Sequence, residues 1–540
     1  MASLAACGGG GGSSSSPVPP GGGSTATPTP TATPVATGSP VANGVSLLTA
    51  TSGTFTARVA ASAADELVLA QEPTTPTEPP SSGSLTQYTV TVSETAGATG
   101  SSVARNPASA SRAAALAQRI RENHALDAVD GFREKTFPAA ALREQFRGLT
   151  ATPLRSPQST RTTRAAQGTV GTQRSFKIIT STIGNSGSCA GGSTQGTYIC
   201  NVTITATLEA AGAHGNIWVD NASLATSGEF TNVPAEFQQI AQDFDSYYAT
   251  ETAAFAPAFY AGLAPATFSF SSSKPQCDSN GNALPSSQYV QTDLSGSNGT
   301  SIDVVITDAL AGTGEGGYYY IVNEIPQSVW DCASPPRPVS NNASMVVVTG
   351  NNYTVAANAP QFNESYWLNT DIPRSMSHEL QHLLHAHYKV LKPEISGTGQ
   401  RTGDDSFVDE GMSMLAEDLA ANGAQIDTPR YSFAFLLEPS LFSLTAFTGF
   451  QPNPTSTASN PPYGWYSNTG GSYGQAYLFQ RYLYDRFGGA EITSIYNSTG
   501  TSVQAVAAAA NEPFPQIYRE FMAAVAAQNT NAAGAPYAFS

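Results

Sequence analysis

The stretch S-M-S-H-E-L-Q-H-L-L-H-A-H, residues 375–387, holds four of the six histidines of this 540-residue chain. Within it, H-E-L-Q-H runs from His378 to His382. In a helix, residues four apart differ by about 40° in azimuth and about 6 Å in rise, so their side chains share one face. The spacing predicts a helix that presents the imidazoles of His378 and His382 to one metal ion.

The same stretch supplies a candidate base for hydrolysis. A catalytic zinc ion takes three protein ligands and keeps one position for water, whose pKa falls toward about 7. Glu379 follows the first histidine directly, where its carboxylate can take a proton from that water. His385 lies on the same face but about 10 Å of helix rise from His378, so we expect it to pack or hydrogen-bond beside the site rather than bind the metal.

The third ligand is expected downstream, in F-V-D-E-G-M-S-M-L-A-E-D-L, residues 407–419. Its apolar positions follow a helical period, and Asp409 near the start suits the positive end of a helix dipole. Glu410, in the first turn, is the predicted third zinc ligand. Glu417, on the same face, is a candidate to hydrogen-bond a ligand histidine.

These motifs resemble those of the gluzincin metallopeptidases and, within them, the hyicolysin-like bacterial neutral metallopeptidases. Further matches are the I-W-V-D strand at 217–220 and the helix Y-G-x-x-x-L-F-x-x-Y-L at 473–483, so the resemblance covers about residue 176 to the C-terminus. It departs from many gluzincins at Met414, where they carry an acid. The resemblance implies a zinc-dependent endopeptidase of protein or peptide substrates, with Tyr473, or else Tyr466, stabilising the oxyanion.

Composition divides the chain into four predicted regions. Residues 1–44 are a Gly/Ser/Thr/Pro-rich linker, 45–100 a small β-module, 101–173 a basic helical connector or pro-like segment, and 174–540 the zinc metallopeptidase domain. The predicted fold class is α+β: a zincin-like domain with a mostly antiparallel sheet, a zinc helix and a helical C-terminal part, after a disordered N-terminal tether. We expect it to act as a monomer.

Charge and cysteines bear on partners and compartment. Residues 178–540 carry 30 acids against 10 Lys and Arg, so nucleic acid is not an expected partner. Cys7 in L-A-A-C-G resembles a lipoprotein lipobox, although the charged and apolar parts of a signal peptide are missing. A lipid there would be the membrane attachment of an extracytoplasmic protein, outer-membrane-anchored or secreted. The other four cysteines are expected to pair as Cys189–Cys200 and Cys277–Cys332.

Local patterns predict the remaining elements. Strands are expected at 176–182, 198–209, 215–220, 301–308, 318–324 and 343–350, and helices at 236–248, 474–487 and, as a closing pair, 502–528. Ser375 or Ser377 is expected to cap the zinc helix after Pro373, and residues 421–470 to be irregular.

Two other functions stay open from sequence. One is a non-catalytic surface lipoprotein or adhesin with a vestigial zinc site, and the other is a zinc hydrolase of substrates other than peptides.

Overall fold

The computed structural model describes the chain in separate stretches. These are residues 39–42, 45–47, 149–153, 169–182, 194–196, 199–225, 234–255, 266–271, 273–289, 302–310, 316–333, 338–350, 367–391, 403–421, 432, 435–436, 442–452, 463–467 and 470–527. Cys7, Cys189 and nearly all of the predicted tether, β-module and connector lie outside them. From the first two of these predicted regions the structure describes a short antiparallel pair, β1 (Ser39–Ala42) and β2 (Val45–Leu47).

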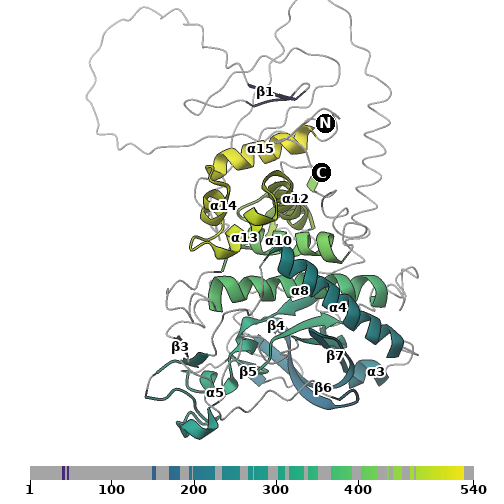
Figure 1. Ribbon diagram of the computed structural model, residues 1–540, viewed down its shortest axis with the longest axis vertical. Coiled ribbons are helices and arrows are strands. Elements are labelled where there is room, and N and C mark those ends of the chain that lie inside the picture. Colours follow the sequence, from purple (N-terminus) through teal and green to yellow (C-terminus); the bar gives the residue numbers. More distant parts are fainter. Residues whose placement is uncertain are drawn as a thin grey trace, which may run out of the picture.

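The main sheet is curled and mixed, so the α+β class is confirmed (Figure 1). Its strand order is β10-β11-β9-β7-β6-β4, with the short β5 also on β6. The strands are β4 (Gln173–Thr182), β5 (Thr194–Gly196), β6 (Ile199–Ala211), β7 (Gly215–Asp220), β9 (Ile302–Thr307), β10 (Gly317–Tyr319) and β11 (Met345–Thr349).

Pairing in this sheet is mostly antiparallel, as predicted, but its centre is parallel. β7 with β9 and β9 with β11 run parallel, and the other four pairings are antiparallel. A parallel pair needs a long crossover, and α4 (Pro234–Ala254) lies in the one between β7 and β9. Every residue of β7 and β9 is buried, which is typical of strands covered on both faces.

A second, two-stranded sheet joins part of the predicted connector to the region that follows. β3 (Thr150–Pro153) pairs antiparallel with β8 (Ala266–Ser269). Leu149, just before β3, is fully buried in the hydrophobic core. The folded unit therefore includes residues before position 174.

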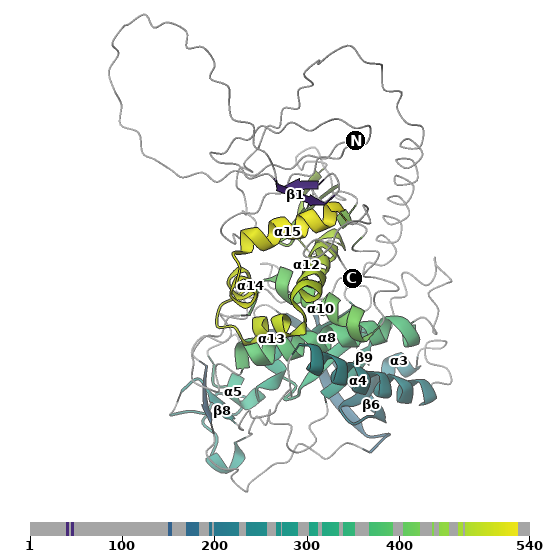
Figure 2. The ribbon, with the colours of Figure 1, turned by 45° about the horizontal axis from the view of Figure 1, so that its top comes forward.

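The helix with the H-E-x-x-H motif is central. It is α8 (Ile372–Ala386), which contacts the sheet, α4 and α10 (Ser406–Ala420) (Figures 1 and 2). Beyond α10 lie α12 (Gly470–Phe487), α13 (Gly489–Asn497), α14 (Val503–Ala510) and α15 (Phe514–Ala527). The predicted closing pair of helices is confirmed, and α13 is an additional helix.

Three local predictions were wrong. The zinc helix is not capped by Ser375 or Ser377: it begins at Ile372, directly after a π-helical turn at Trp367–Asp371, and Pro373 lies in its first turn, where proline is tolerated. Residues 421–470 contain a three-stranded antiparallel sheet of β12 (Phe442–Ser443), β13 (Thr448–Pro452) and β14 (Tyr463–Ser467). The predicted strand at 318–324 ends at Tyr319 and continues as a 3-10 turn, Ile321–Glu324.

The remaining short elements and the disulfide complete the fold. Short helices are α3 (Asn221–Ala225), α5 (Gln327–Trp330), 3-10 turns at Ser286–Gln288 and Asp308–Leu310, and a π-helical turn at His387–Leu391. Cys277 and Cys332 form the predicted disulfide. The other predicted pair, Cys189–Cys200, includes Cys189, which lies outside the described residues. Within the described part of the chain, no helix is long and apolar enough to cross a membrane.

Gly411 lets α10 and α12 approach closely. A Cβ at this position would lie 2.7 Å from the Ala476 carbonyl oxygen and 2.8 Å from Gln480 Cγ.

Because a backbone carbonyl oxygen cannot move away without shifting the helix, Gly411→Ala should lower the free energy of unfolding by about 1–3 kcal/mol, measured by denaturant unfolding. Gly403→Ala is the matched control, because nothing lies within 4 Å of a Cβ there. Equal stability of the two variants would contradict the packing.

Candidate metal centre

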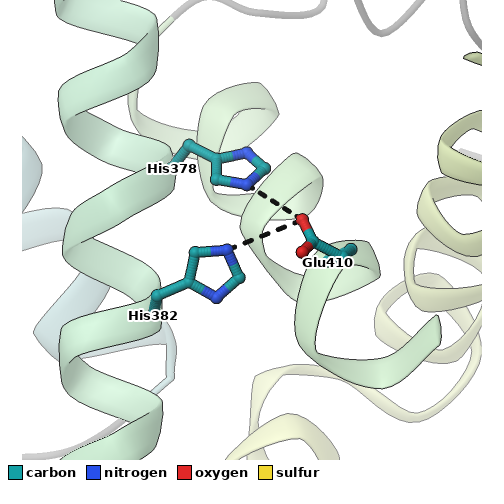
Figure 3. Close-up of side chains that lie close together, drawn as sticks. All are labelled: His378, His382 and Glu410. Carbon is teal, nitrogen blue, oxygen red and sulfur yellow. Dashed lines mark hydrogen bonds and ion pairs between the residues drawn. The ribbon is translucent and has the colours of Figure 1, made fainter. Parts of the chain in front are cut away.

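Helix α8 buries polar side chains on nearly all of its surface. His378 is fully buried, Glu379 is 1% exposed, and the ring of His382 retains 13% exposure. Buried polar groups need hydrogen-bond, ionic or metal partners, so the partners of these side chains define the surroundings of the helix. The predicted helical spacing is present, and the two imidazoles emerge from one side of α8 with ring centroids 4.9 Å apart (Figure 3).

Helix α10 brings Glu410 to the same point. Its Oε2 lies 3.2 Å from His378 Nε2 and 3.6 Å from His382 Nε2 (Figure 3). Two ligand atoms bound at about 2.1 Å in a tetrahedral shell lie about 3.4 Å apart, so these separations fit around a zinc ion. The three ligand atoms lie within 4.8 Å of one another, and two nitrogens with one carboxylate oxygen suit zinc. The structure thus brings together the three predicted ligands, His378, His382 and Glu410.

The other ring nitrogen of each histidine faces a different carboxylate. His378 Nδ1 lies 2.7 Å from Glu417 Oε1, and His382 Nδ1 lies 3.0 Å from Asp409 Oδ1. A carboxylate accepts but does not donate when ionised, so both Nδ1 atoms carry the proton and donate it. This leaves each Nε2 to face Glu410. The predicted contact of Glu417 with a candidate ligand histidine is confirmed.

Electrostatics in the metal-free site favour a positive His382 and a negative Glu410. Burial opposes protonation of His382, but Asp409 and Glu410 outweigh it and raise its pKa well above the usual value. Burial likewise opposes ionisation of Glu410, but His382 and His378 lower its pKa to about 2. The raised pKa of His382 therefore favours a second proton on its ring, at Nε2, and this proton has to leave before a metal binds there.

Glu379 lies against the edge strand β10. A Cβ built on Gly317 would lie 3.2 Å from both Cγ and Oε1 of Glu379 and 2.8 Å from the Val347 carbonyl oxygen. Glycine at this position leaves the space that the Glu379 side chain occupies.

The two tyrosines named by the resemblance lie on α12 and β14. Tyr473 lies in the first turn of α12, is 4% exposed and packs edge-to-face on Phe447, with ring centroids 5.0 Å apart. It is one helical turn from Ala476, whose carbonyl approaches Gly411 beside Glu410. The alternative, Tyr466, lies in β14, and its side chain is outside the described residues.

Several residues around the site were missed by the sequence analysis. Asp409 was assigned only a helix-dipole role, yet it contacts two histidines. Arg374 donates to Glu417 Oε1 at 3.3 Å and so helps to hold the carboxylate behind His378. Glu251 of α4 accepts a hydrogen bond from Ser377 at 2.8 Å, and burial raises its pKa well above the usual value. These partners come from elements distant in sequence, so no local pattern signals them.

His385 takes the place beside the site that its spacing predicts. It is not part of the ligand group and contacts Asp409 and Asp404 instead. His214 is a strand-end residue whose ring stacks on Tyr248 at 4.0 Å between centroids.

No protein-family model matches the chain, and comparison with curated proteins finds no relative. The gluzincin resemblance therefore remains a prediction, and function is argued from the site itself.

Zinc binding at neutral pH should release at least one proton per ion, because protonated His382 has to lose its proton. Calorimetric zinc titrations in buffers of different ionisation enthalpy measure this number. Asp409→Asn removes a carboxylate that raises the His382 pKa, so it should release fewer protons at the same pH. A heat that does not depend on the buffer would contradict the assigned protonation.

Proposed function

We propose that the chain is a zinc-dependent endopeptidase. The observation that carries the proposal is the convergence of His378 Nε2 and His382 Nε2 on Glu410 Oε2, with Glu379 next to the first histidine in a buried helix. A zinc ion held there would supply a Lewis acid and would lower the pKa of water bound to it.

The chain's own residues divide the remaining work. His378, His382 and Glu410 hold the ion, while Glu417 and Asp409 fix the orientation of the two imidazoles. Glu379 takes a proton from the attacking water and returns it to the nitrogen of the leaving amine.

Tyr473 is proposed to donate a hydrogen bond to the oxyanion. Its position one turn from the close contact of α12 with Gly411 supports a place near the ligand from α10. The proposal of peptide substrates rests on the gluzincin resemblance, and the acidic character of residues 178–540 disfavours nucleic acids.

An extracytoplasmic location is part of the same proposal. The Cys277–Cys332 disulfide supports it, because disulfides persist mainly in oxidising compartments. A lipid on Cys7 remains the proposed anchor, and the proposed working form is a monomer.

Glu379→Gln tests the function. The variant should bind one zinc ion with little change in affinity. Its turnover of an unfolded protein should fall at least about 100-fold, because the amide cannot accept the proton. The assay uses the full chain with and without a zinc chelator, and the wild type should lose activity with the chelator. Full activity of the variant would remove Glu379 as the base.

Glu491→Gln is the matched control, since Glu491 is also buried and burial, with the nearby Glu512, raises its pKa to about 7. It lies in α13, outside the proposed machinery, so its turnover should remain that of the wild type. The same assay on Tyr473→Phe and Tyr466→Phe decides which tyrosine serves the oxyanion. Wild-type chain that binds zinc but cleaves no unfolded protein would contradict the peptidase proposal.

A further inference from the structure

Asp409 links His382 to a second histidine that the proposed reaction does not use. Its Oδ1 lies 3.0 Å from His382 Nδ1 and 2.6 Å from His385 Nδ1. One carboxylate oxygen therefore accepts from both rings. The position of the Asp409 carboxylate, and with it the ring of His382, depends on where His385 is held.

His385 is held on its far side by Asp404. His385 Nε2 lies 2.8 Å from Asp404 Oδ2, so each ring nitrogen faces a carboxylate and both can donate. Burial opposes this doubly protonated form, but Asp409 and Asp404 outweigh it and raise the pKa of His385 to about 9. The ring of His385 also packs edge-to-face on Tyr496, with centroids 5.0 Å apart, which restricts its rotation.

Lys389 completes the charge balance around Asp404. Its Nζ lies 3.2 Å from Asp404 Oδ2 and donates to the carbonyl oxygens of Ser498 at 3.3 Å and Gly500 at 3.0 Å. Both side chains are almost fully buried, at 2% and 0% exposure. The ion pair joins the π-helical turn after α8 to Asp404, and the two hydrogen bonds of Lys389 join it to the turn between α13 and α14.

The far end of that turn is tied to the start of α10. Ser502 donates its backbone N–H to Asp404 Oδ1, and its Oγ accepts from the backbone N–H of Asp405 at 2.6 Å. Ser502 has φ 51° and ψ −116°, a strained conformation for a residue with a side chain. A strained backbone conformation persists only where its surroundings hold it in place. Here the hydrogen bonds with Asp404 and Asp405, just before α10, hold Ser502.

We propose that His385, Lys389, Asp404 and the turn at 498–502 form a clamp that positions His382 through Asp409 and thereby sets the zinc affinity of the site. These are positioning residues, since none touches the ligand atoms. The inference rests on the proposed function only in its requirement that the three ligands bind zinc.

The test measures zinc affinity of the full chain by competition with a chelator of known affinity. In His385→Gln the amide can take the place of Nε2 toward Asp404 but leaves Asp409 without its second donor. Zinc should bind about 10-fold more weakly, the lower end of the range for lost partners of ligand histidines. The visible absorption of the cobalt-substituted protein should also shift, because the His382 ring is reoriented.

His387→Gln is the matched control. His387 is a buried histidine just after α8. Its Nε2 lies 3.1 Å from Oε1 of Glu324, which belongs to the 3-10 turn Ile321–Glu324 and not to the proposed clamp. This variant should lose stability without a change in zinc affinity or cobalt spectrum. Unfolding midpoints of the metal-free proteins measure the stability of each variant separately.

His385→Asn separates the two halves of the clamp, because its amide can take the place of Nδ1 toward Asp409 but cannot reach Asp404. Weaker zinc binding in both His385 variants supports the clamp. Weaker binding in the Gln variant alone would overturn the part assigned to Asp404, Lys389 and the turn. Unchanged affinity in both, or equal losses in His387→Gln, would overturn the inference while leaving the zinc site intact. A wild type that binds no zinc would instead overturn the proposed function.

Discussion

Where α8 meets α10, charged and polar side chains are withdrawn from water, and each has to be matched by a partner of opposite charge or by a hydrogen bond. Both nitrogens of each histidine have a carboxylate partner. His378 Nδ1 faces Glu417, His382 Nδ1 faces Asp409, and both Nε2 atoms face Glu410. The same arrangement fixes both tautomers and leaves two nitrogens and one oxygen close enough to share an ion. Packing of the two helices alone does not explain these charged side chains. Apolar residues of similar volume at the same positions would usually give a fold that is equally or more stable than one with a buried ionic cluster.

The central part of the site could be predicted because it depends on local geometry. Helical spacing places His378 and His382 on one face, and the apolar period of residues 407–419 indicates the second helix that carries Glu410, which lies just after the first turn of α10. The close approach of the helices at Gly411 then follows from the missing side chain.

The supports of the site depend instead on contacts between distant segments. Arg374 meets Glu417 across 43 residues, and Asp404 meets Ser502 across 98. Nothing in the spacing of one sequence specifies such pairs. The mostly antiparallel pairing of the sheet was predicted, but its parallel centre was not. The parallel pairing of β7 with β9 depends on the long crossover that contains α4, and so on a contact between distant segments. The early start of α8 was missed because Pro373 was taken as a boundary, although the first turn of a helix accepts proline.

X-ray absorption at the zinc edge, on the full chain loaded with one equivalent of zinc, tests the central claim most directly. The three-ligand site predicts a shell of light atoms only, with two imidazole nitrogens at about 2.0–2.1 Å and carboxylate oxygen at about 2.0–2.2 Å. It also predicts that the imidazole signal falls by half in His382→Ala. A sulfur shell at about 2.3 Å, or a spectrum unchanged in that variant, would place the zinc elsewhere and contradict the assignment.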